Sequence, residues 1–320
     1  MNFKILVDII VPVYRVEKYI EKSLMSICNQ NFYNYRIIIV NDGTPDKSME
    51  IAYGVLKNSG RNYLVINQNN KGLPGARNSG LKASSAKYVV FVDSDDILAN
   101  DFISSLFAAC EHNYSNASFC DYEITTEKNR EGKNNKDNGS LTYTRDELLL
   151  LNMTRKIKIH LCATLLNRQF LLNNNLFFDE KLRFGEEVDY TWRLFPMLDK
   201  MVHVKSAKYK YLVRPNSLMT MQNTQRVLYL FDHMHDVISK WFADKPEDEK
   251  NFKWVEYKIY IEKVHAFAQQ SDYKTFKKMI EASNYKNKMK KLKDFPDIKI
   301  RCLALLLNIT PYLYWKIFQF

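Results

Sequence analysis

The sequence predicts an α/β fold, in which a mixed, mostly parallel sheet is flanked by helices and followed by a helical C-terminal extension. Three observations lead to this prediction. Short β-branched apolar segments alternate with segments of helical periodicity over the first 125 residues. These apolar segments have no polar face, which is typical of buried parallel strands. From residue 222 onward the pattern is helical, with charged and aromatic residues interleaved.

The elements expected in the first half follow one another in a regular order. Strands are expected at Asp8–Val13, Arg36–Val40, Tyr63–Asn67, Tyr88–Val92 and Ala117–Tyr122. Helices are expected at Val16–Asn29, Lys47–Leu56, Pro74–Ala83 and Asp101–His112. Repeated strand–helix units of this kind imply a parallel sheet with helices on both of its faces.

The second half has a more mixed pattern. Residues Glu127–Ser140 are rich in Lys, Asn and Gly, and we expect them to form a surface loop. Helices are then expected at Arg145–Asn152 and Val188–Leu198, and strands at Cys162–Asn167, Met201–Val204 and Lys208–Leu212. We therefore place an α/β domain at residues 1–220, with halves of about 1–125 and 140–220, and a basic, amphipathic helical extension at 221–320.

The composition excludes several classes of protein. With 46% hydrophobic and 13% aromatic residues the chain can bury a core, and 9 glycines and 8 prolines exclude a collagen-like chain. The five cysteines are widely spaced and contain no Cys-x-x-Cys, so neither a disulfide framework nor a zinc site is expected. The net charge of +11 indicates an anionic partner.

The C-terminal region is basic and aromatic. Tyr285–Arg301 holds seven basic and two acidic residues, and Cys302–Phe320 is mostly Leu, Ile, Tyr, Trp and Phe. No eighteen uninterrupted apolar residues occur, and Asp8 interrupts the apolar start before a signal peptide can form. These features favour a cytoplasmic protein bound peripherally to the anionic inner face of the cell membrane. The alternative is a C-terminal helix packed on the α/β domain with a solvated lysine face.

Polar residues follow three of the expected strands. In open α/β sheets, ligands bind at the carboxyl ends of strands. These ends carry Pro12-Val13-Tyr14, Asn41-Asp42-Gly43 and Asp93-Ser94-Asp95-Asp96. The carboxylates of Asp93, Asp95 and Asp96 are hard oxygen ligands that suit Mg²⁺ or Mn²⁺ holding a substrate phosphate. The alternative is an acidic turn in which Asp96 or Asn100 caps the next helix.

Four ordered segments carry a resemblance to a known family. Val11–Gln30, Ile37–Ser48, Asn70–Gly80 and Tyr88–Asp96 resemble family 2 glycosyltransferases, which have the Rossmann-like GT-A fold. The resemblance is strong over residues 5–125 and extends more weakly to about residue 220. It implies an inverting, metal-dependent transfer of sugar from a UDP-sugar to a glycan acceptor on a lipid carrier. The setting it implies is the assembly of a bacterial capsule, lipopolysaccharide or exopolysaccharide.

The resemblance also implies roles for individual residues. Nucleotide-sugar-binding positions match Pro12, Val13, Tyr14, Glu17, Asp42, Arg77 and Asp93. Asp42 matches the aspartate that binds the uracil edge, and Arg77 lies in the loop that covers the nucleotide-sugar. Asp95 matches the metal ligand for Mg²⁺ or Mn²⁺. The alternatives are that Asp42 merely orders a turn with Gly43 and that Arg77 is a surface helix residue.

The catalytic base is expected in a later block. Phe184–Tyr190 resembles the family's E-D-x-x-[FW] segment, with Glu187 in place of the usual aspartate. An inverting transfer needs one carboxylate to accept the proton of the acceptor hydroxyl. Glu187 is the first candidate and Asp189 the rival. The alternative is that Glu186 and Glu187 only favour a helix N-terminus through the helix dipole.

One further block resembles the family's diphosphate segment. Tyr211–Ser217 matches Y-x-x-R-x-x-S, which implies that Arg214 and Ser217 approach the diphosphate. The alternative is an arginine on a surface hairpin. His160, His203 and His265 are isolated in the sequence, and we expect structural roles for them.

Two other functions compete with an active transferase. The Glu187 departure from the family pattern is compatible with a catalytically impaired relative that only binds a nucleotide-sugar. A sugar-1-phosphate nucleotidyltransferase would need an early Gly-rich loop with a basic residue, which Val11–Tyr14 does not provide. The acidic clusters argue against a nucleic-acid partner, and the sequence leaves the oligomeric state open.

Overall fold

The computed structural model describes residues 4–126, 139–154, 156–182, 184–213, 233 and 249–319. The chain divides into two compact units, each of which is described by itself. The first comprises residues 1–152 and 157–220, and the second comprises 153–156 and 221–320.

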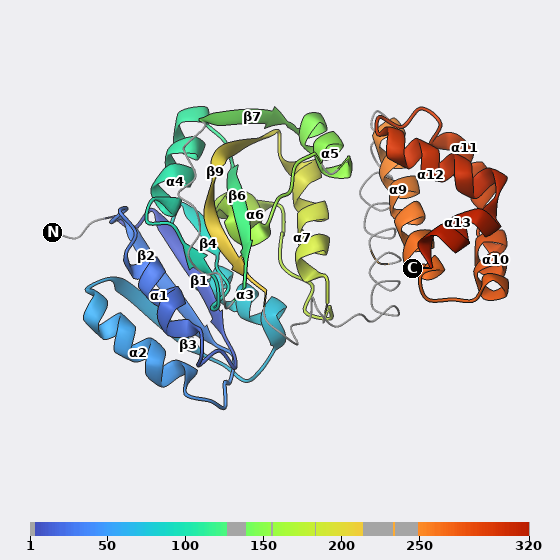
Figure 1. The fold of residues 1–320 in the computed structure, drawn as a ribbon. Coiled ribbons are helices and arrows are strands. Elements are labelled where there is room, and N and C mark those ends of the chain that lie inside the picture. Colours follow the sequence, from blue (N-terminus) through green and yellow to red (C-terminus); the bar gives the residue numbers. More distant parts are fainter. Residues whose placement is uncertain are drawn as a thin grey trace. The chain divides into compact units, whose positions relative to one another are not determined.

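The first unit is built on one nine-stranded mixed sheet (Figure 1). Its strands are β1 (Val7–Val13), β2 (Tyr35–Asn41), β3 (Asn62–Asn67), β4 (Tyr88–Phe91), β5 (Ile97–Leu98), β6 (Ala117–Thr125), β7 (Ser140–Thr144), β8 (Thr164–Asn167) and β9 (Lys200–Leu212). The order is β3-β2-β1-β4-β8-β6-β9-β5, and β7 pairs with β9. Strands β1 to β4 are parallel, whereas β8 runs antiparallel to both β4 and β6. The predicted α/β class is confirmed.

Most predicted strands lie within a residue or two of their expected bounds, but three features differ. Met201–Val204 and Lys208–Leu212 form one continuous strand, β9, because β6 pairs with it from Val202 to Leu212 through register shifts around Asp121. Strand β7 begins at Ser140, inside the segment expected to be a loop, because its backbone completes an antiparallel edge on β9. The two-residue β5 is too short to leave a periodic signal.

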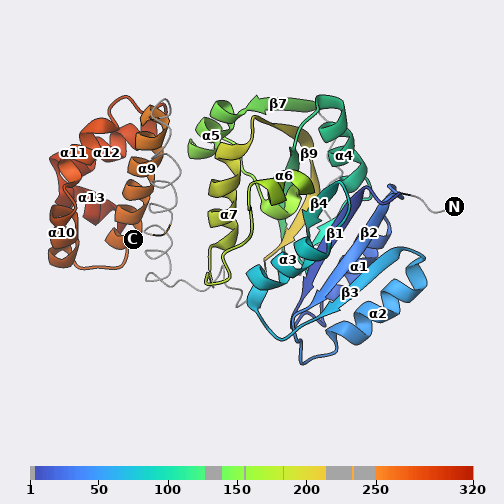
Figure 2. The same ribbon diagram turned by 180° about the vertical axis from the view of Figure 1, so that it is seen from behind.

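Helices cover both faces of this sheet (Figures 1 and 2). On one face lie α1 (Ile20–Cys28), α2 (Ser48–Ser59) and α4 (Phe102–Asn113), whose apolar residues share one core cluster. On the other face lie α3 (Gly72–Ala83), α6 (Arg168–Asn173) and α7 (Glu186–Leu194). Among the described residues, the first unit also contains helix α5 (Arg145–Met153). The helix predicted to reach Leu198 ends earlier, because a 3₁₀ turn containing Pro196 follows α7.

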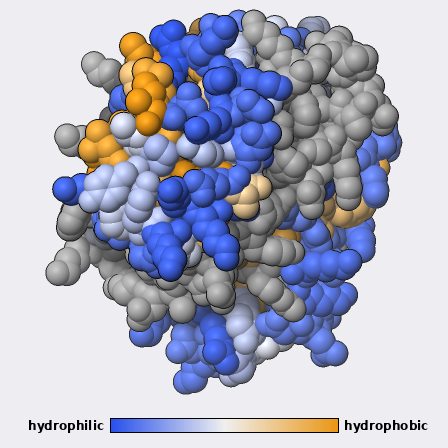
Figure 3. Space-filling model, turned by 90° about the vertical axis from the view of Figure 1, so that its right-hand side faces the viewer, coloured by the Kyte–Doolittle hydropathy of each residue, from blue (hydrophilic) through white to orange (hydrophobic). Residues whose placement is uncertain are grey.

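The described part of the second unit is helical. It contains α9 (Glu249–Ala268), α10 (Tyr273–Ala282), α11 (Tyr285–Lys291), α12 (Ile298–Ile309) and α13 (Pro311–Phe318). Asp272 and Asp297 cap α10 and α12, since each carboxylate accepts a backbone N–H of the first turn. Among the described residues, no helix is long and apolar enough to cross a bilayer. Figure 3 shows the face of the molecule that is on the right in Figure 1. On this face apolar side chains, in orange, gather in one region beside hydrophilic ones, in blue.

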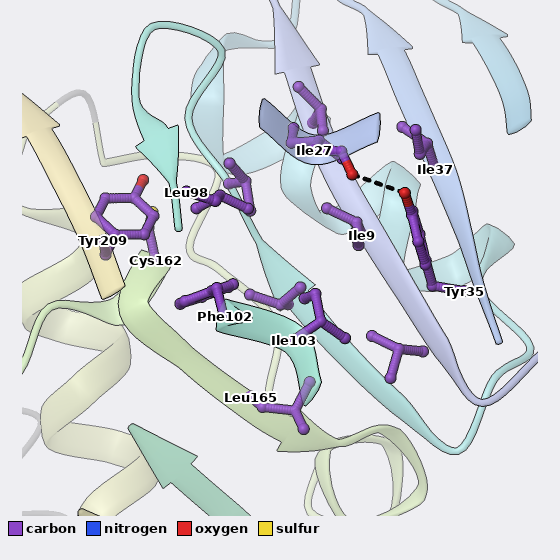
Figure 4. Packing of buried hydrophobic residues seen from close by; sticks show 14 of the residues in the cluster. Ile9, Ile27, Tyr35, Ile37, Leu98, Phe102, Ile103, Cys162, Leu165 and Tyr209 are labelled. Carbon is purple, nitrogen blue, oxygen red and sulfur yellow. Dashed lines mark hydrogen bonds between the residues drawn. The ribbon is translucent and has the colours of Figure 1, made fainter. Parts of the chain in front are cut away.

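The main core of the first unit lies between the sheet and helices α1, α2 and α4 (Figure 4). Ile9, Ile37 and Leu165 point from the strands toward Ile27 and Ile103 of the helices, and all five are buried. The Tyr35 hydroxyl inside this core donates to the Ile27 carbonyl oxygen at 2.7 Å. A buried hydroxyl with a partner avoids a desolvation cost of about 1–3 kcal/mol.

The opposite face of the sheet packs closely on α3. A Cβ atom added at Gly80 would lie 2.3 Å from Cγ2 of Ile10 in β1. Only glycine permits this approach of helix to strand. The contact between Gly80 and Ile10 fixes how closely α3 packs on the sheet. It thereby helps to position Arg77, which lies in the same helix.

Candidate active site

The carboxyl ends of β1, β2 and β4 meet at one edge of the sheet, as their parallel pairing requires. Val13 is in register with Asn41, and the Asp42 N–H donates to the Val13 carbonyl oxygen at 3.1 Å. The Val92 N–H, one residue beyond β4, donates to the Ile10 carbonyl oxygen at 2.9 Å. The three sequence motifs at these strand ends therefore lie along the same edge.

The loop after β1 is tied to the start of α2. Pro12 and Val13 are buried at the end of β1, whereas the following Tyr14 is exposed. The carboxylate of Glu17 accepts the Lys47 N–H at 3.1 Å, just before α2 begins. A hydrogen bond between a backbone N–H and a side chain thus holds the loop to the start of α2, and Tyr14 is left exposed beside the strand ends.

Asp42 is buried and anchors the start of α3. One carboxylate oxygen accepts Gln68 Nε2 at 2.7 Å and the Lys71 N–H at 2.8 Å, and the other accepts the Gly72 N–H at 2.9 Å. A carboxylate at a helix N-terminus is favoured by the unpaired amides and the dipole there. Asp42 therefore positions the segment that leads into α3, which is more than ordering a turn with Gly43.

Arg77 is the centre of the site. Its side chain is fully buried in α3, so the surface-helix alternative is wrong, and it lies on a helix rather than in a loop. Nη2 donates to Asp93 Oδ1 at 2.8 Å and to Glu187 Oε1 at 2.6 Å. Nη1 lies 3.5 Å from Glu186 Oε1. One guanidinium thus joins the end of β4 to the first turn of α7.

The charges of this cluster stabilise one another. Burial lowers the pKa of Arg77, but the carboxylates of Asp93, Glu187 and Glu186 together hold it well above its ordinary value. Burial raises the pKa of Glu187, yet Arg77 and then His160 hold that carboxyl below its usual range. Glu187 is therefore a carboxylate at neutral pH, while its side chain remains 27% exposed.

Cys162 and His160 line the site, although the sequence analysis did not assign them to it. Cys162 Sγ lies 3.4 Å from Arg77 Nη2 and 3.6 Å from Glu187 Oε1. His160 Nδ1 accepts the Cys162 N–H at 3.1 Å, and its ring stacks on Tyr209. His160 immediately precedes the short 3₁₀ helix Leu161–Ala163, which contains Cys162 and lies just before β8. Because β8 is antiparallel to β4, its start lies at the edge where β4 ends.

Asp96 does not cap the next helix, and neither does Asn100. Asp96 is fully buried and accepts the Tyr209 hydroxyl at 2.5 Å and the Leu212 N–H at 2.8 Å. The residue before α4 is Asp101, whose side chain makes no cap hydrogen bond. Asp96 therefore ties the acidic turn to the end of β9, and burial, then Asp95 and Asp93, raise its pKa well above the ordinary value.

Asp189 lies in α7 but is engaged differently from Glu187. It is buried, and Oδ2 accepts Arg193 Nη2 at 2.5 Å, one helical turn away. Glu187 instead contacts Arg77 and so shares a cation with Asp93. The geometry favours Glu187 over Asp189 as the carboxylate at the strand ends. Arg214 and Ser217 lie outside the described residues.

Some of the side chains at this site are suitable ligands for a hard divalent cation, and others are not. Ligand atoms of Asp93, Cys162 and Glu187 lie within 4.8 Å of one another. Burial raises the pKa of Cys162 well above its ordinary value, so it is a neutral thiol and a poor ligand for Mg²⁺ or Mn²⁺. The carboxylate oxygens of Asp93 and of the partly exposed Asp95 suit those ions. The residues that suit a divalent metal are thus Asp93 and Asp95, which follow β4.

The sequence motifs identify most residues of the site but not the contacts between them. Four residues that shape it were not assigned to it from the sequence: Glu186, Cys162, His160 and Tyr209. Glu186 was visible as the first of two adjacent glutamates, and the other three carry no local signal. His203, by contrast, has the expected structural role, because it stacks on Phe119 and pairs with Asp121 at 2.8 Å.

Comparison with solved structures identifies the fold. Residues 1–349 of S. aureus TarS superpose with a TM-score of 0.70 at 16% identity, covering 98% of this chain and 90% of that one. A complex of the same protein with UDP-GlcNAc gives a TM-score of 0.66 at 18% identity, covering 98% and 90%. The GT-A fold expected from the sequence is confirmed.

Two relatives are similar in sequence. The uncharacterized glycosyltransferase EpsJ of Bacillus subtilis (strain 168) is 34% identical over 222 residues, which is 67% of this chain and 62% of EpsJ. The minor teichoic acid biosynthesis protein GgaB of the same organism is 28% identical over 259 residues, which is 79% of this chain and 28% of GgaB. This chain thus spans less than two thirds of the length of either relative.

A family model decides the classification. The model described as glycosyl transferase family 2 matches residues 8–172, just over half of the chain. The matched region holds β1 to β4, Asp42, Arg77 and the acidic turn after β4. The chain belongs to glycosyl transferase family 2.

Proposed function

We propose that this chain transfers a sugar from a UDP-sugar to a hydroxyl group of a glycan acceptor, with inversion at the anomeric carbon. The observation that carries the proposal is the joining of Asp93 and Glu187 through Arg77 at the edge where β1, β2 and β4 end. Membership of glycosyl transferase family 2 supports the reaction class. The UDP-GlcNAc complex of TarS, which has the same fold, supports a uridine donor.

The donor would lie along the strand ends. In this proposal Pro12, Val13 and Tyr14 contact the base, Glu17 lies near the ribose, and Asp42 faces the uracil edge. The anchoring of Asp42 by Lys71 and Gly72 supports a rigid base pocket, since its position is fixed before a nucleotide binds. Asp93 would contact the ribose or sugar, and Arg214 and Ser217 would approach the diphosphate.

The chemical step would use Glu187 as the base. The acceptor oxygen attacks the anomeric carbon, the bond from that carbon to the diphosphate oxygen breaks, and UDP leaves with the bonding electrons. Glu187 takes the proton of the attacking hydroxyl. Arg77 keeps Glu187 ionised and ready to accept it, at the cost of making it a weaker base. Asp189, which is buried against Arg193, is the less suitable base.

A divalent cation completes the proposal. Asp95, together with Asp93, would hold Mg²⁺ or Mn²⁺, which neutralises negative charge on a departing diphosphate when bound. Among the described residues Arg77 Nε has no hydrogen-bond partner, and Nη1 has only the ion-pair contact with Glu186 at 3.5 Å. They support a further polar or anionic group at this centre, because a buried unpaired donor is costly.

The acceptor and its location follow from the relatives and from charge. The name of GgaB ties that relative to teichoic acid biosynthesis, which supports a cell-surface polymer as acceptor. The chain's net charge of +11 suits work at an anionic surface. We therefore propose a lipid-linked acceptor glycan of a capsule, lipopolysaccharide or exopolysaccharide, met at the inner face of the cell membrane by a peripherally bound enzyme.

One observation favours a second candidate. Glu187 lies 2.6 Å from a fully buried arginine, and an ion pair this close reduces its basicity. A protein that binds a nucleotide-sugar without transferring it would tolerate this arrangement. Such a binder would be stabilised by UDP but would release none from any donor.

The test is UDP release by the full chain from UDP-glucose, UDP-galactose, UDP-N-acetylglucosamine and UDP-N-acetylgalactosamine, with Mn²⁺ or with EDTA. We expect EDTA-sensitive release from one donor, which Asp95→Asn removes. Asp146→Asn is the matched control, because Asp146 is exposed and pairs only locally with Arg145. UDP stabilisation in a thermal-shift assay without turnover, even with added acceptor lipid, would favour the binder. If UDP does not stabilise the protein and no donor is turned over, both candidates are contradicted.

A further inference from the structure

A broad groove in the C-terminal unit has the chemistry of an anion site. Its volume is about 940 Å³, and four cationic side chains line it: Lys290, Lys291, Lys293 and Arg301. One carboxylate, Asp294, accompanies them and lies 4.0 Å from Lys293. All four cationic residues are exposed, so their charges face the solvent side of the groove. Four cations against one carboxylate attract an anion rather than one another.

Apolar side chains continue from this groove onto the surface. Leu305 lines the groove and is 58% exposed. With it, a set of apolar residues on α12 and α13 is between 45% and 66% exposed, which we call the α12–α13 stripe: Ile298, Leu305, Ile309, Tyr312, Leu313 and Ile317. On α12 the spacings of seven and four residues place its members on one helix face. A cluster of exposed large apolar residues marks an interaction surface.

The two features together point to an amphiphile. A phosphate bound in the groove would leave its attached chains beside Leu305 and the α12–α13 stripe. Lys and Arg near an anionic membrane surface each contribute about 1 kcal/mol of attraction, and apolar helix faces enter the boundary between headgroups and acyl chains. Helix α12 has 12 residues and α13 has 8, so neither can cross a hydrocarbon core of about 30 Å. Both have the length of helices that lie within the interface.

We propose that the groove and the α12–α13 stripe bind the surface of an anionic bilayer, with lipid phosphates in the groove and the stripe among the acyl chains. This deepens the proposed function, because it names the surface that meets the membrane carrying the acceptor. Charge favours this occupant over a second copy of the chain, since lysine is depleted in protein interfaces and two copies would oppose like charges. Nucleic acid would satisfy the cations but leave the stripe exposed.

The test is co-sedimentation of the full chain with vesicles of phosphatidylcholine alone or with 30% phosphatidylglycerol. The groove variant is Lys290→Gln/Lys293→Gln/Arg301→Gln, and the stripe variant is Leu305→Ser/Ile309→Ser/Leu313→Ser. The matched control is Lys274→Gln/Lys277→Gln/Lys278→Gln, which removes three lysines of α10 in the same unit. We expect binding only to the anionic vesicles. The groove variant should lose on the order of a hundredfold in partitioning, from about 1 kcal/mol per cation, and the control should lose much less.

Other outcomes would overturn the proposal. Equal binding to both kinds of vesicle would show that the groove does not select an anionic lipid surface. Equal losses in the groove variant and the control would show that the cations of the groove have no particular part in the binding. A stripe variant that binds as the wild type, or that changes a dimer seen by light scattering into a monomer, would assign the stripe to another partner. Circular dichroism checks the fold of each variant. UDP release without vesicles separates the two proposals, because the groove variant should retain it whether or not the membrane site exists.

Discussion

Asp93 and Glu187 bind the same nitrogen of one arginine. Nη2 of Arg77 lies 2.8 Å from the Asp93 carboxylate and 2.6 Å from that of Glu187. Asp93 follows β4, and Glu187 stands in the first turn of α7. The contact joins the half of the unit that contains β4 to the half that supplies the proposed base, so the geometry of both depends on one buried side chain.

Replacing Arg77 should destabilise the protein and abolish transfer. Removing one partner of a buried ion pair costs about 3–5 kcal/mol, because the remaining carboxylates lose their counter-charge. We expect a loss of that size for Arg77→Ala, measured by urea unfolding at pH 7. Arg77→Lys keeps the charge but not the planar fork, and should fall between wild type and Arg77→Ala. Lys82→Ala, an exposed change in the same helix, is the control, and equal small losses for all three variants would contradict the prediction.

Glu187→Gln and Asp189→Asn should separate the two candidate bases. Glu187→Gln removes the proton acceptor, so UDP transfer to an accepted glycan should fall by at least about a hundredfold. Asp189→Asn breaks the contact with Arg193 and should reduce stability by about 1 kcal/mol while leaving transfer within a few-fold. Initial rates at saturating donor, together with unfolding midpoints, are the measurements. A larger loss of rate in Asp189→Asn would reverse the assignment.

Removal of the metal should stop transfer reversibly. EDTA should abolish UDP release, and Mn²⁺ or Mg²⁺ should restore it. Loss of a residue that only supports a metal ligand costs about 10–100-fold in affinity, so Asp95→Asn should raise the half-saturating Mn²⁺ concentration at least as much. Titration of Mn²⁺ against UDP release measures both. Unchanged metal dependence in Asp95→Asn would move the ligand role to another carboxylate.

The stability contributed by Asp46 should depend on pH. Its carboxylate accepts the Ser48 N–H at 3.1 Å and the Thr44 hydroxyl at 2.7 Å; although burial raises the pKa of Asp46, these hydrogen bonds hold it below the ordinary value. A lowered pKa stabilises the fold above the unfolded-state value and loses that contribution as pH falls through the folded-state value. Asp46→Asn should therefore cost about 1 kcal/mol at pH 7 and progressively less below pH of about 4. Urea unfolding from pH 7 down to pH 3 tests this, with Glu50→Gln in the first turn of α2 as the control. A difference between Asp46→Asn and wild type that grows toward acid pH would contradict the prediction.

Gly80→Ala should be destabilising although alanine favours helices. The new methyl group would meet Ile10 Cγ2 at 2.3 Å, and such overpacking costs about 1–3 kcal/mol. Gly54→Ala in α2 is the matched control, because a Cβ there meets nothing within 4 Å and should stabilise by about 0.5–1 kcal/mol. Both changes are measured by urea unfolding. A double-mutant cycle with Ile10→Ala should show coupling, and additive effects would place the clash elsewhere.

The arrangement of the motifs at one sheet edge could be predicted from sequence. The apolar runs that end at Val13, Val40 and Val92 identify buried parallel strands, and parallel strands present their carboxyl ends on the same side. Asp42 and Asp93 are therefore placed near the same edge without knowledge of any contact between them. Local signals suffice here because strand direction and strand ends are properties of short segments.

The partners of these residues were decided only by the tertiary structure. Arg77 and Glu187 are 110 positions apart, and their contact depends on how α3 and α7 pack on one face of the sheet. Other long-range contacts bury Cys162 beside the carboxylates and make Asp96 an anchor for β9, whereas the Asp189–Arg193 pair is an i,i+4 contact within α7. The sequence by itself determined which segments form strands and helices and where the acidic turns lie, since these depend on neighbouring residues. The ion pairs of Arg77, and with them the choice between Glu187 and Asp189, depend on long-range packing, which local patterns do not encode.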